Sequence, residues 1–515
     1  MSAPAASTST STNAPQEPPA RAQLLPTTPP ATRSSSLRTA STLLHASLSV
    51  AFPTETVYGL GASALSSTAV KRIFSAKGRP SDNPLIVHVS SRAMLDGLLP
   101  THKDGGGKVA LPKMYDALMD AFWPGALSLV FPLAHLDPKG KGKATDYDPP
   151  RLAVAPEVTA GHASLCVRMP SHPLALDLIR ESDLPLAAPS ANLSSRPSPT
   201  SAAHVMHDLG EGRGVGAVLD GGECEVGVES TVVDWVPPAE GEREGGEGAL
   251  RILRAGGVTA EEIEACLQKA GFATTASSSS STDSGAKQVQ VYARDFRNQD
   301  LEDKPTTPGM KYKHYAPGNA KVVLVKPVRK EDVTDDLGPL PSLQDLVQLT
   351  ALTHAKVEVD DEGRTVEVPF RVGLMLTEET LEGLKAEVVS SSSSSAADQP
   401  ADSSAPSSEV RYDTLSLPPP PPSLFSTLSL GEDSNLPDLS SLSILSSPLG
   451  SQSRPIEAAQ RLFGGLRLFD SLDGEGVDLI LVEAVREEGV GLAVMERARK
   501  AAGGTERGGE MEFLL

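Results

Sequence analysis

The chain has 515 residues, and its 46 Lys and Arg against 66 Asp and Glu give a formal net charge of -20 at pH 7. This excess of acid disfavours a surface that binds polyanions in general, so any phosphate site must be a local pocket. Cys166, Cys224 and Cys266 are too widely spaced to suggest a disulfide framework or a zinc site. No apolar run approaches the roughly 18 residues that span a bilayer, and we expect two compact domains with no stable membrane association.

Residues 1–44 predict a disordered N-terminal tail, because Ser, Thr, Ala and Pro dominate them. The formal charges among the first fifty residues are Glu17, Arg21, Arg33 and Arg38. This acid-poor, Arg-only composition is also typical of organellar transit peptides. We expect a cytoplasmic protein, with a mitochondrial pool as the alternative that this segment leaves open.

Strands and helices alternate over residues 45–272, which is the pattern of an α/β domain. Short apolar runs predict buried strands, and apolar residues at three- and four-residue spacing predict helices. The expected strands are 48–52, 85–89, 127–131, 165–169 and 231–234, and the expected helices are 68–74 and 173–179. Two hydrophilic stretches, 137–150 and 237–248, indicate surface insertions.

A second, smaller α/β domain is expected over 321–515, after a linker that spans 273–320. Strand patterns at 321–325, 370–376 and 478–482, and a helix that begins at Pro455, indicate this domain. Runs of Ser and Pro predict a disordered insertion over 388–452. Within the linker, segment 308–317 is basic and aromatic, unlike its surroundings, which is not needed in a simple tether. Packing between the domains is one explanation, and the family resemblance described below implies another, a lid that covers the active site.

Three basic residues are candidates for binding anionic substrates. Lys77 and Arg79 lie between a predicted helix and a buried strand, and two cations so close together suit a triphosphate. A solvated turn is the alternative. Arg168 lies inside an apolar strand, where a buried cation needs an anionic partner. That partner is either a substrate carboxylate or an internal Asp or Glu, and the sequence leaves both open.

Four blocks of sequence occur in a fixed order along the chain. They are PTETVYGLG from Pro53, KGRPSDNPL from Lys77, GVESTVVD from Gly227 and PGMKYKHYAP from Pro308. Together they resemble the YrdC-like threonylcarbamoyl-AMP synthases in their two-domain form. The resemblance implies an α/β fold with a twisted, open, mixed sheet and flanking helices, followed by a smaller Rossmann-like α/β domain.

The resemblance further implies a nucleotidyltransferase, an L-threonylcarbamoyladenylate synthase. Such an enzyme forms threonylcarbamoyl-AMP and pyrophosphate from L-threonine, bicarbonate or CO2, and ATP, for threonylcarbamoyladenosine modification of tRNA. Mg2+ would be held mainly through the phosphates of ATP, with no metal ligands from the protein. The product would pass to a downstream tRNA threonylcarbamoyl transferase, and direct binding of tRNA would be weak or absent.

By the same resemblance, individual residues are assigned to the substrates. Lys77 and Arg79 would be the catalytic pair beside the phosphates. The residues that would contact L-threonine are Thr56, His88, Arg168, Ala188 and Ser230. Those that would contact ATP are Arg79, Asn83, Ser164, Ser190, Ser198, Arg254 and Tyr315.

A different reading is an RNA-binding module without adenylate-forming activity, because YrdC-like domains present a basic concavity. The net acidity of the chain and the lack of basic, aromatic-rich strands argue against it. Two positions depart from the family's usual residues. Ala255 stands where Pro is usual, and Glu496 stands where Asn is usual.

Overall fold

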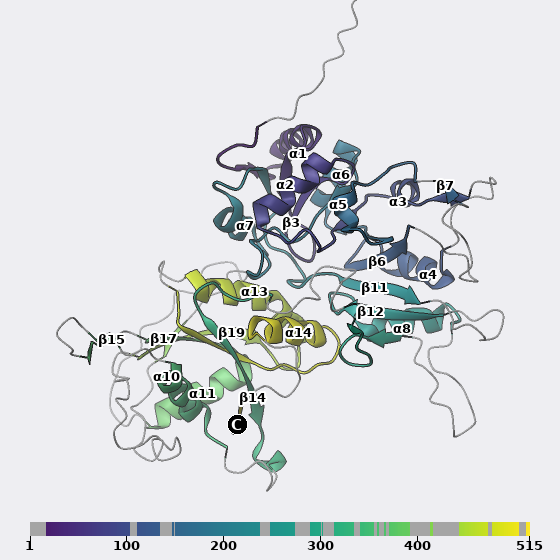
Figure 1. The fold of residues 1–515 in the computed structure, drawn as a ribbon. Helices are drawn as coiled ribbons and strands as arrows, with labels where there is room; N and C mark the ends of the chain where they lie inside the picture. Colours follow the sequence, from purple (N-terminus) through teal and green to yellow (C-terminus); the bar gives the residue numbers. More distant parts are fainter. Residues whose placement is uncertain are drawn as a thin grey trace, which may run out of the picture.

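Two large β-sheets organise the chain, one in each half of the sequence (Figure 1). The computed structural model describes residues 17–102, 111–133, 147–148, 150–236, 248–272, 289–299, 301, 314–333, 340–354, 358–359, 365–366, 370–391, 413–415, 442–471, 476–503 and 511–514. Within these ranges, every helix is too short or too polar to cross a membrane.

The first sheet has 11 strands in the order β1-β10-β2-β3-β9-β4-β8-β6-β11-β12-β13. Its strands are β1 (Gln23–Pro26), β2 (Ser49–Phe52), β3 (Gly59–Ser63), β4 (Ile86–His88), β6 (Leu127–Pro132), β8 (Ser164–Arg168), β9 (Leu186–Ala187), β10 (Val215–Asp220), β11 (Thr231–Val236), β12 (Ala249–Arg254) and β13 (Val289–Val291). Neighbours pair in both directions, for example β4 with β8 in parallel and β6 with β8 antiparallel. The expected α/β fold with a mixed sheet is therefore confirmed.

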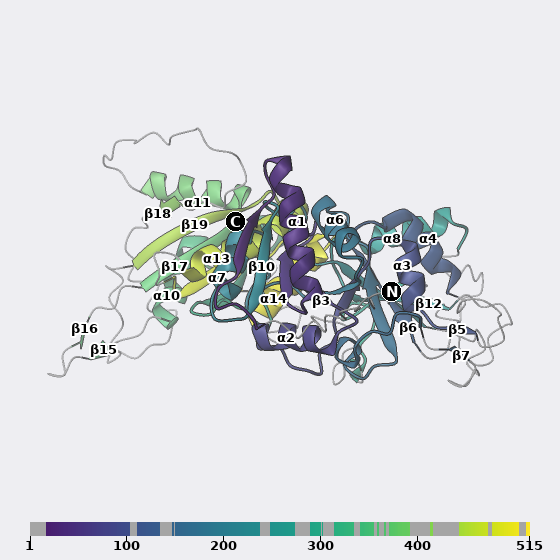
Figure 2. The same cartoon turned by 90° about the horizontal axis from the view of Figure 1, so that it is seen from above.

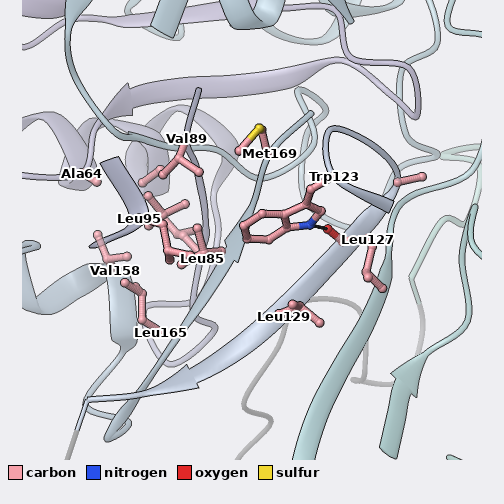
Figure 3. Close-up of a cluster of buried hydrophobic side chains, with 14 of the residues drawn as sticks. Ala64, Leu85, Val89, Leu95, Trp123, Leu127, Leu129, Val158, Leu165 and Met169 are labelled. Carbon is pink, nitrogen blue, oxygen red and sulfur yellow. Dashed lines mark hydrogen bonds between the residues drawn. The ribbon is translucent and has the colours of Figure 1, made fainter. Parts of the chain in front are cut away.

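The helices of this half are α1 (Pro30–His45), α2 (Ser67–Lys77), α3 (Arg92–Leu98), α4 (Lys113–Phe122), α5 (Pro156–Thr159), α6 (Pro173–Ser182), α7 (Ala202–Leu209) and α8 (Ala260–Lys269). A small separate sheet pairs β5 (Thr101–His102) with β7 (Tyr147–Asp148). Figure 3 shows part of the main core, in which the Trp123 indole donates its N–H to the Leu127 carbonyl at 2.8 Å. That bond satisfies the one polar atom of a large side chain that is otherwise packed among apolar residues.

The second sheet has six strands in the order β18-β19-β17-β20-β14-β21, and all of its pairs are parallel except β18 with β19. Its strands are β14 (Lys321–Val328), β17 (Phe370–Thr377), β18 (Asp413–Leu415), β19 (Leu442–Gly450), β20 (Leu479–Glu483) and β21 (Met511–Leu514). A separate hairpin pairs β15 (Glu358–Val359) with β16 (Thr365–Val366), and a short 3-10 helix spans Lys330–Asp332.

Helices cover both faces of this second sheet. One apolar cluster holds side chains of α10 (Leu343–His354) and α11 (Glu378–Ser391), and another holds side chains of α13 (Pro455–Ser471) and α14 (Gly491–Ala501). Because both faces are covered, the central strands must be apolar on both sides. β20 is buried along its whole length, which is why its apolar run is visible in the sequence.

The N-terminal tail expected over residues 1–44 is wrong from Gln23 onward. Strand β1 pairs in parallel with β10, and helix α1 packs against α6. Leu37 and Leu44 of α1 are buried in the same apolar cluster as Leu178 of α6. This region is therefore part of the first domain, and a leader ending at residue 44 would include a helix of its core.

Two other expected boundaries also shift. β13 lies inside the expected linker 273–320, yet it extends the first sheet by pairing with β12. β19 lies inside the expected insertion 388–452, yet it pairs with β17 over most of its length. Residues 308–313 of the expected lid fall outside the described part of the chain, whereas residues 314–317 fall within it.

Helices α13 and α14 lie between the two sheets in Figure 1, and Figure 2 shows the same arrangement from above. Arg467 of α13 reaches Asp208 of α7, with Nη1 to Oδ1 at 3.2 Å and Nη2 to Oδ2 at 2.8 Å. Burial alone would raise the pKa of Asp208, but the hydrogen bonds and charge of Arg467 lower that pKa to about 2. A buried, two-pronged ion pair thus joins the domains.

We expect Gly227→Ala to weaken this domain contact. Gly227 has a φ of +79°, and a Cβ there would come closer than 3.0 Å to backbone atoms of Ala459 and Gln460 in α13. Gly222→Ala is the matched control, because its φ is +81° and a Cβ there would meet nothing within 4 Å. Both changes carry left-handed strain of about 1–2 kcal/mol. Urea unfolding should show the larger loss for Gly227→Ala, and equal losses would contradict a rigid contact.

Candidate functional site

A cavity of about 50 Å3 lies among the loops and strand ends of the first sheet and is closed by residues from the linker. Its walls come from the loop between β2 and β3, from β4, β8 and β12, and from the loops that follow β9 and precede β11. Nine of the predicted site residues line it: Thr56, Arg79, His88, Arg168, Ala188, Ser190, Ser230, Arg254 and Tyr315. Four do not: Lys77, Asn83, Ser164 and Ser198.

Arg168 ends β8 and has an internal partner. Its Nη2 lies 2.5 Å from Oε1 of Glu55, its Nη1 donates to the Thr56 hydroxyl at 2.8 Å, and its Nε donates to the Gly125 carbonyl. Burial would raise the pKa of Glu55, but the charge and hydrogen bond of Arg168 lower it. Of the two partners that the sequence left open, the protein supplies a glutamate, while the guanidinium still lines the cavity.

The end of α2 positions both predicted catalytic cations. Gly78 follows the helix with a φ of +60°, and the Arg79 amide bonds back to the Phe74 carbonyl, which turns the chain sharply. The Arg79 guanidinium then donates to the carbonyls of Asn83 and Pro84 at 3.2 and 3.0 Å. Burial lowers the pKa of Arg79 to about 10, which leaves it charged at neutral pH.

Lys77, the other residue of the expected catalytic pair, does not line the cavity. Its ammonium donates to the carbonyls of Ser190 and Asn192 and lies behind the cavity wall. Burial first, and then the charge of Arg79, lower the pKa of Lys77 well below its usual range. In this arrangement Lys77 holds the loop that carries Ser190 and Asn192.

Two polar atoms at the site have no hydrogen-bond partner among the described residues. They are Nδ1 of His88 and Oδ1 of Asn83, and both are buried. Burial and the charge of Arg168 lower the pKa of His88 to about 3, so its imidazole is neutral. Buried polar atoms are rarely left unpaired unless a ligand or water completes them, which fits the roles expected for these two residues.

Ser164 and Ser198 lie outside the cavity for different reasons. Ser164 begins β8, and the parallel register of Ile86 with Cys166 places it level with Pro84, beside the carbonyl that Arg79 contacts. Ser198 is fully buried and donates to Oε1 of Glu229 at 2.6 Å. Ser198 therefore acts through Glu229.

Glu229 joins the cavity to the second domain. Its Oε2 lies 3.0 Å from Nε of Arg497 in α14, and both side chains are buried. Burial would raise the pKa of Glu229, but the charges of Arg497 and Arg254 lower that pKa to about 2. Arg254 donates to the carbonyl and hydroxyl oxygens of Ser230. One residue of the second domain thus holds a carboxylate in the cavity wall.

The two departures from the family's usual residues contact each other. The Ala255 amide donates to Oε2 of Glu496 at 3.3 Å, and Oε1 of Glu496 lies 2.6 Å from the Lys500 ammonium. A proline at position 255 has no amide hydrogen and could not make this bond. The two changes are therefore physically linked.

His314 and Tyr315 close the cavity from the linker side. The centroid of the Tyr315 ring lies 5.2 Å from that of the Phe463 ring of α13, and the Arg497 guanidinium lies 6.0 Å from the Tyr315 centroid. Burial raises the pKa of Tyr315 and lowers that of His314 to about 3, so both are neutral at pH 7. Part of the expected lid segment is thus packed between the domains and over the site.

The cavity is electropositive. Three arginines line it, Arg79, Arg168 and Arg254, whereas Glu229 is the one carboxylate among its described lining residues. No group of three or more His, Cys, Asp and Glu side chains in the described ranges could hold a metal ion. The arrangement suits a ligand or pair of ligands that bears several negative charges.

Sequence analysis missed Glu55, Glu229, His314 and Arg497. Glu55 and Glu229 lie in the quoted sequence blocks and were visible there as acids inside apolar surroundings, which is a signal for a buried partner. Arg497 gave no comparable signal, because its partner Glu229 is 268 positions away in the chain.

Comparisons with known proteins agree with this architecture. The family of Sua5, yciO and yrdC domains, described as telomere recombination, matches residues 42–256. The family described as threonylcarbamoyl-AMP synthase, C-terminal domain, matches residues 258–503. Among solved structures, Pyrococcus abyssi Sua5 complexed with L-threonine is similar, with a TM-score of 0.56, 30% identity and coverage of 94% of this chain and 96% of that one.

Relatives of similar length share about a third of the sequence. The threonylcarbamoyl-AMP synthase of Schizosaccharomyces pombe is 35% identical, over 92% of this chain and 90% of that protein. The enzyme of the same name from Bacillus subtilis is also 35% identical, over 90% of this chain and 92% of that protein. The chain therefore belongs to the threonylcarbamoyl-AMP synthase family, in the form that carries a C-terminal domain.

Proposed function

We propose that this chain joins L-threonine, bicarbonate or CO2, and ATP into threonylcarbamoyl-AMP and pyrophosphate. The observation that carries the proposal is the charge of the cavity: the buried Arg168 and Arg254 and the half-buried Arg79 line it, and its one described carboxylate is held by Arg497 and Ser198. A threonine carboxylate and a triphosphate would together supply the missing negative charge.

The cavity offers two ends for the two substrates. Arg168 and Thr56 lie together with the neutral His88 nearby, and this end suits the carboxylate, hydroxyl and amine of L-threonine. Arg79 and Arg254 would supply the charge for the phosphates, together with Ser190 on the loop that Lys77 contacts. Threonine and the α-phosphate of ATP would thus meet at one point.

The reaction needs no nucleophile from the protein. The threonine amine adds to CO2 and loses a proton to form a carbamate, and a carbamate oxygen attacks the α-phosphorus. The bond from that phosphorus to the bridging oxygen breaks, and pyrophosphate leaves with the electron pair. Arg79 and Arg254 stabilise the charge on the phosphates. Mg2+ would bind together with ATP, through the phosphates. Glu229, the one carboxylate among the described lining residues, already pairs with Arg497 and accepts a hydrogen bond from Ser198, so it is not available as a metal ligand.

Closure of the site has a chemical purpose. The cavity of about 50 Å3 is far below the roughly 300–1,000 Å3 of pockets that bury small molecules, so wall residues must move to admit ATP. His314 and Tyr315 belong to that wall. Carbamates and mixed anhydrides hydrolyse readily, so a wall that recloses over them would protect both.

We expect the purified chain to release pyrophosphate from ATP only when L-threonine and bicarbonate are both present. L-Serine is the control, since it lacks the threonine methyl group, and it should support much slower release. Release is measured by an enzyme-coupled assay, and the product is identified by mass spectrometry. Release that ignores threonine would overturn the proposal. A separate tRNA threonylcarbamoyl transferase would consume the product, and this chain itself should bind tRNA weakly.

A further inference from the structure

A second and larger cavity lies in the C-terminal domain, outside the site described above. Its volume is about 680 Å3, which is within the range of pockets that bury small molecules. Residues that end or follow four parallel strands line it: Pro327 of β14, Thr380 after β17, Gln452 after β19 and Val485 after β20. We call it the strand-end crevice.

The topology of the sheet opens a crevice at this edge. The strands β19, β17, β20 and β14 are neighbours in that order. The helices that follow β17 and β14 share one apolar cluster, and those that follow β19 and β20 share the other, so successive neighbours send their helices to opposite faces. Open α/β sheets bind ligands at such points, beyond the carboxyl ends of the strands.

The acids that line the crevice are already engaged within the protein. Glu483 is buried and accepts hydrogen bonds from the Thr377 amide at 2.7 Å, from the Thr380 hydroxyl and from the Gln452 amide. Glu487 lies 2.6 Å from Nη2 of Arg499. Glu379, the third acid of the lining, accepts from the Ser451 hydroxyl and the Gln452 backbone amide. The three carboxylates are therefore held in the walls by donors of the protein, and any anion must bind away from them.

Two arginines at the mouth remain for an anion. Arg329 and Arg486 line the crevice and are both exposed. Arg486 has no ion-pair partner among the described residues, and Arg329 reaches only the exposed Glu331 at 3.6 Å. Exposed pairs of this length contribute little, so a phosphate could replace that contact.

The interior offers an apolar strip and one oriented amide. Pro327, Val485 and Met495 supply flat or flexible apolar surface. Gln452 donates both of its amide hydrogens, to Glu483 and to the Ala484 carbonyl, which turns its amide oxygen away from them as an acceptor. These groups match a nucleobase and an amino or hydroxyl group, respectively.

We propose that the strand-end crevice binds a mononucleotide, with its phosphate at Arg329 and Arg486 and its base against Pro327, beside the buried Val485 and Met495. Helix α14 links the crevice to the active site, since Met495 and Arg499 line the crevice while Arg497, between them, holds Glu229. The proposal concerns a site separate from the one that carries the synthase activity, so either can fail alone.

Equilibrium dialysis of the full chain against radiolabelled AMP tests the proposal. The crevice variant is Arg329→Ala with Arg486→Ala, two exposed residues whose loss should leave folding intact. The matched control is Lys321→Ala with Arg371→Ala, which removes two cations from the opposite edge of the same sheet. A third variant, Arg254→Ala, removes a cation from the active site.

We expect the crevice variant to weaken one class of AMP site by about 100-fold, since it removes two charge-assisted contacts that contribute about tenfold each. The control should not change that class, and Arg254→Ala should retain it. AMP binding that the crevice variant leaves unaltered would overturn the proposal. Displacement of AMP by an equal concentration of inorganic phosphate would also overturn it, because the site would then recognise an anion and not a nucleotide.

Discussion

Arg168→Ala is expected to raise the KM for L-threonine by about 100-fold, because it removes the two-pronged, charge-assisted bond proposed to the threonine carboxylate. The KM for ATP should change little, because Arg79 and Arg254 supply the charge for the phosphates. Initial rates of pyrophosphate release, with each substrate varied in turn, separate the two constants.

Arg168→Ala also leaves Glu55 without its ion-pair partner. The Glu55 side chain is 7% exposed, and its Oε1 lies 2.5 Å from the guanidinium. A loss of stability is therefore expected alongside the kinetic effect. Arg251→Ala is the matched control: Arg251 pairs with Asp234 at 2.5 Å on neighbouring strands of the same sheet, and neither residue lines the cavity. Equal rises in both KM values for Arg168→Ala would contradict its assignment to threonine.

Arg497→Ala is expected to lower both stability and turnover, although Arg497 belongs to the other domain. Removing one partner of a buried ion pair costs about 3–5 kcal/mol, because the remaining charge stays buried without compensation. Here the remaining charge is Glu229, in the wall of the cavity. Urea unfolding followed by Trp fluorescence measures the first effect, and pyrophosphate release measures the second.

Two further variants make that result specific. Arg461 lies on α13, next to α14, and forms a half-exposed ion pair with Glu378 of α11. Arg461→Ala should lower the free energy of unfolding by less than about 1 kcal/mol. Adding Glu229→Gln to Arg497→Ala removes the stranded charge, so stability should partly recover while activity stays low. If the double variant were no more stable than Arg497→Ala, the ion pair would not be the cause.

The sequence predicted the buried strands well and the polar elements poorly. β2, β4, β6, β8 and β11 are short apolar runs, and each lies where the pattern placed it. The sequence analysis did not predict β19, because this strand contains Ser446, Ser447 and Pro448 and is surrounded by Ser-rich sequence. Helix α1 was not predicted for a similar reason, since Ser and Thr separate its few buried leucines.

Nine of the residues that the resemblance singled out line one cavity, whereas their internal partners were not predicted. The family resemblance pointed to Arg168 and Ser198, but the pairing of these residues with Glu55 and Glu229 became visible only in the fold. Glu55 and Arg168 are 113 positions apart, and no local pattern links residues at that separation. The placement of Lys77 behind the wall could not be predicted either, because it depends on the path of the loop at Ser190 and Asn192.

The polypeptide link between the two halves is not their main attachment. Arg467 and Arg497 each reach across to a buried carboxylate, and Gly227 admits the backbone of α13 at close range. These contacts act together with the packing of the linker residue Tyr315 against Phe463 and Arg497. Covalent continuity then serves chiefly to keep the halves at a high effective concentration until they dock. The second domain therefore contributes to the active site much as a separate subunit would, although both domains belong to one chain.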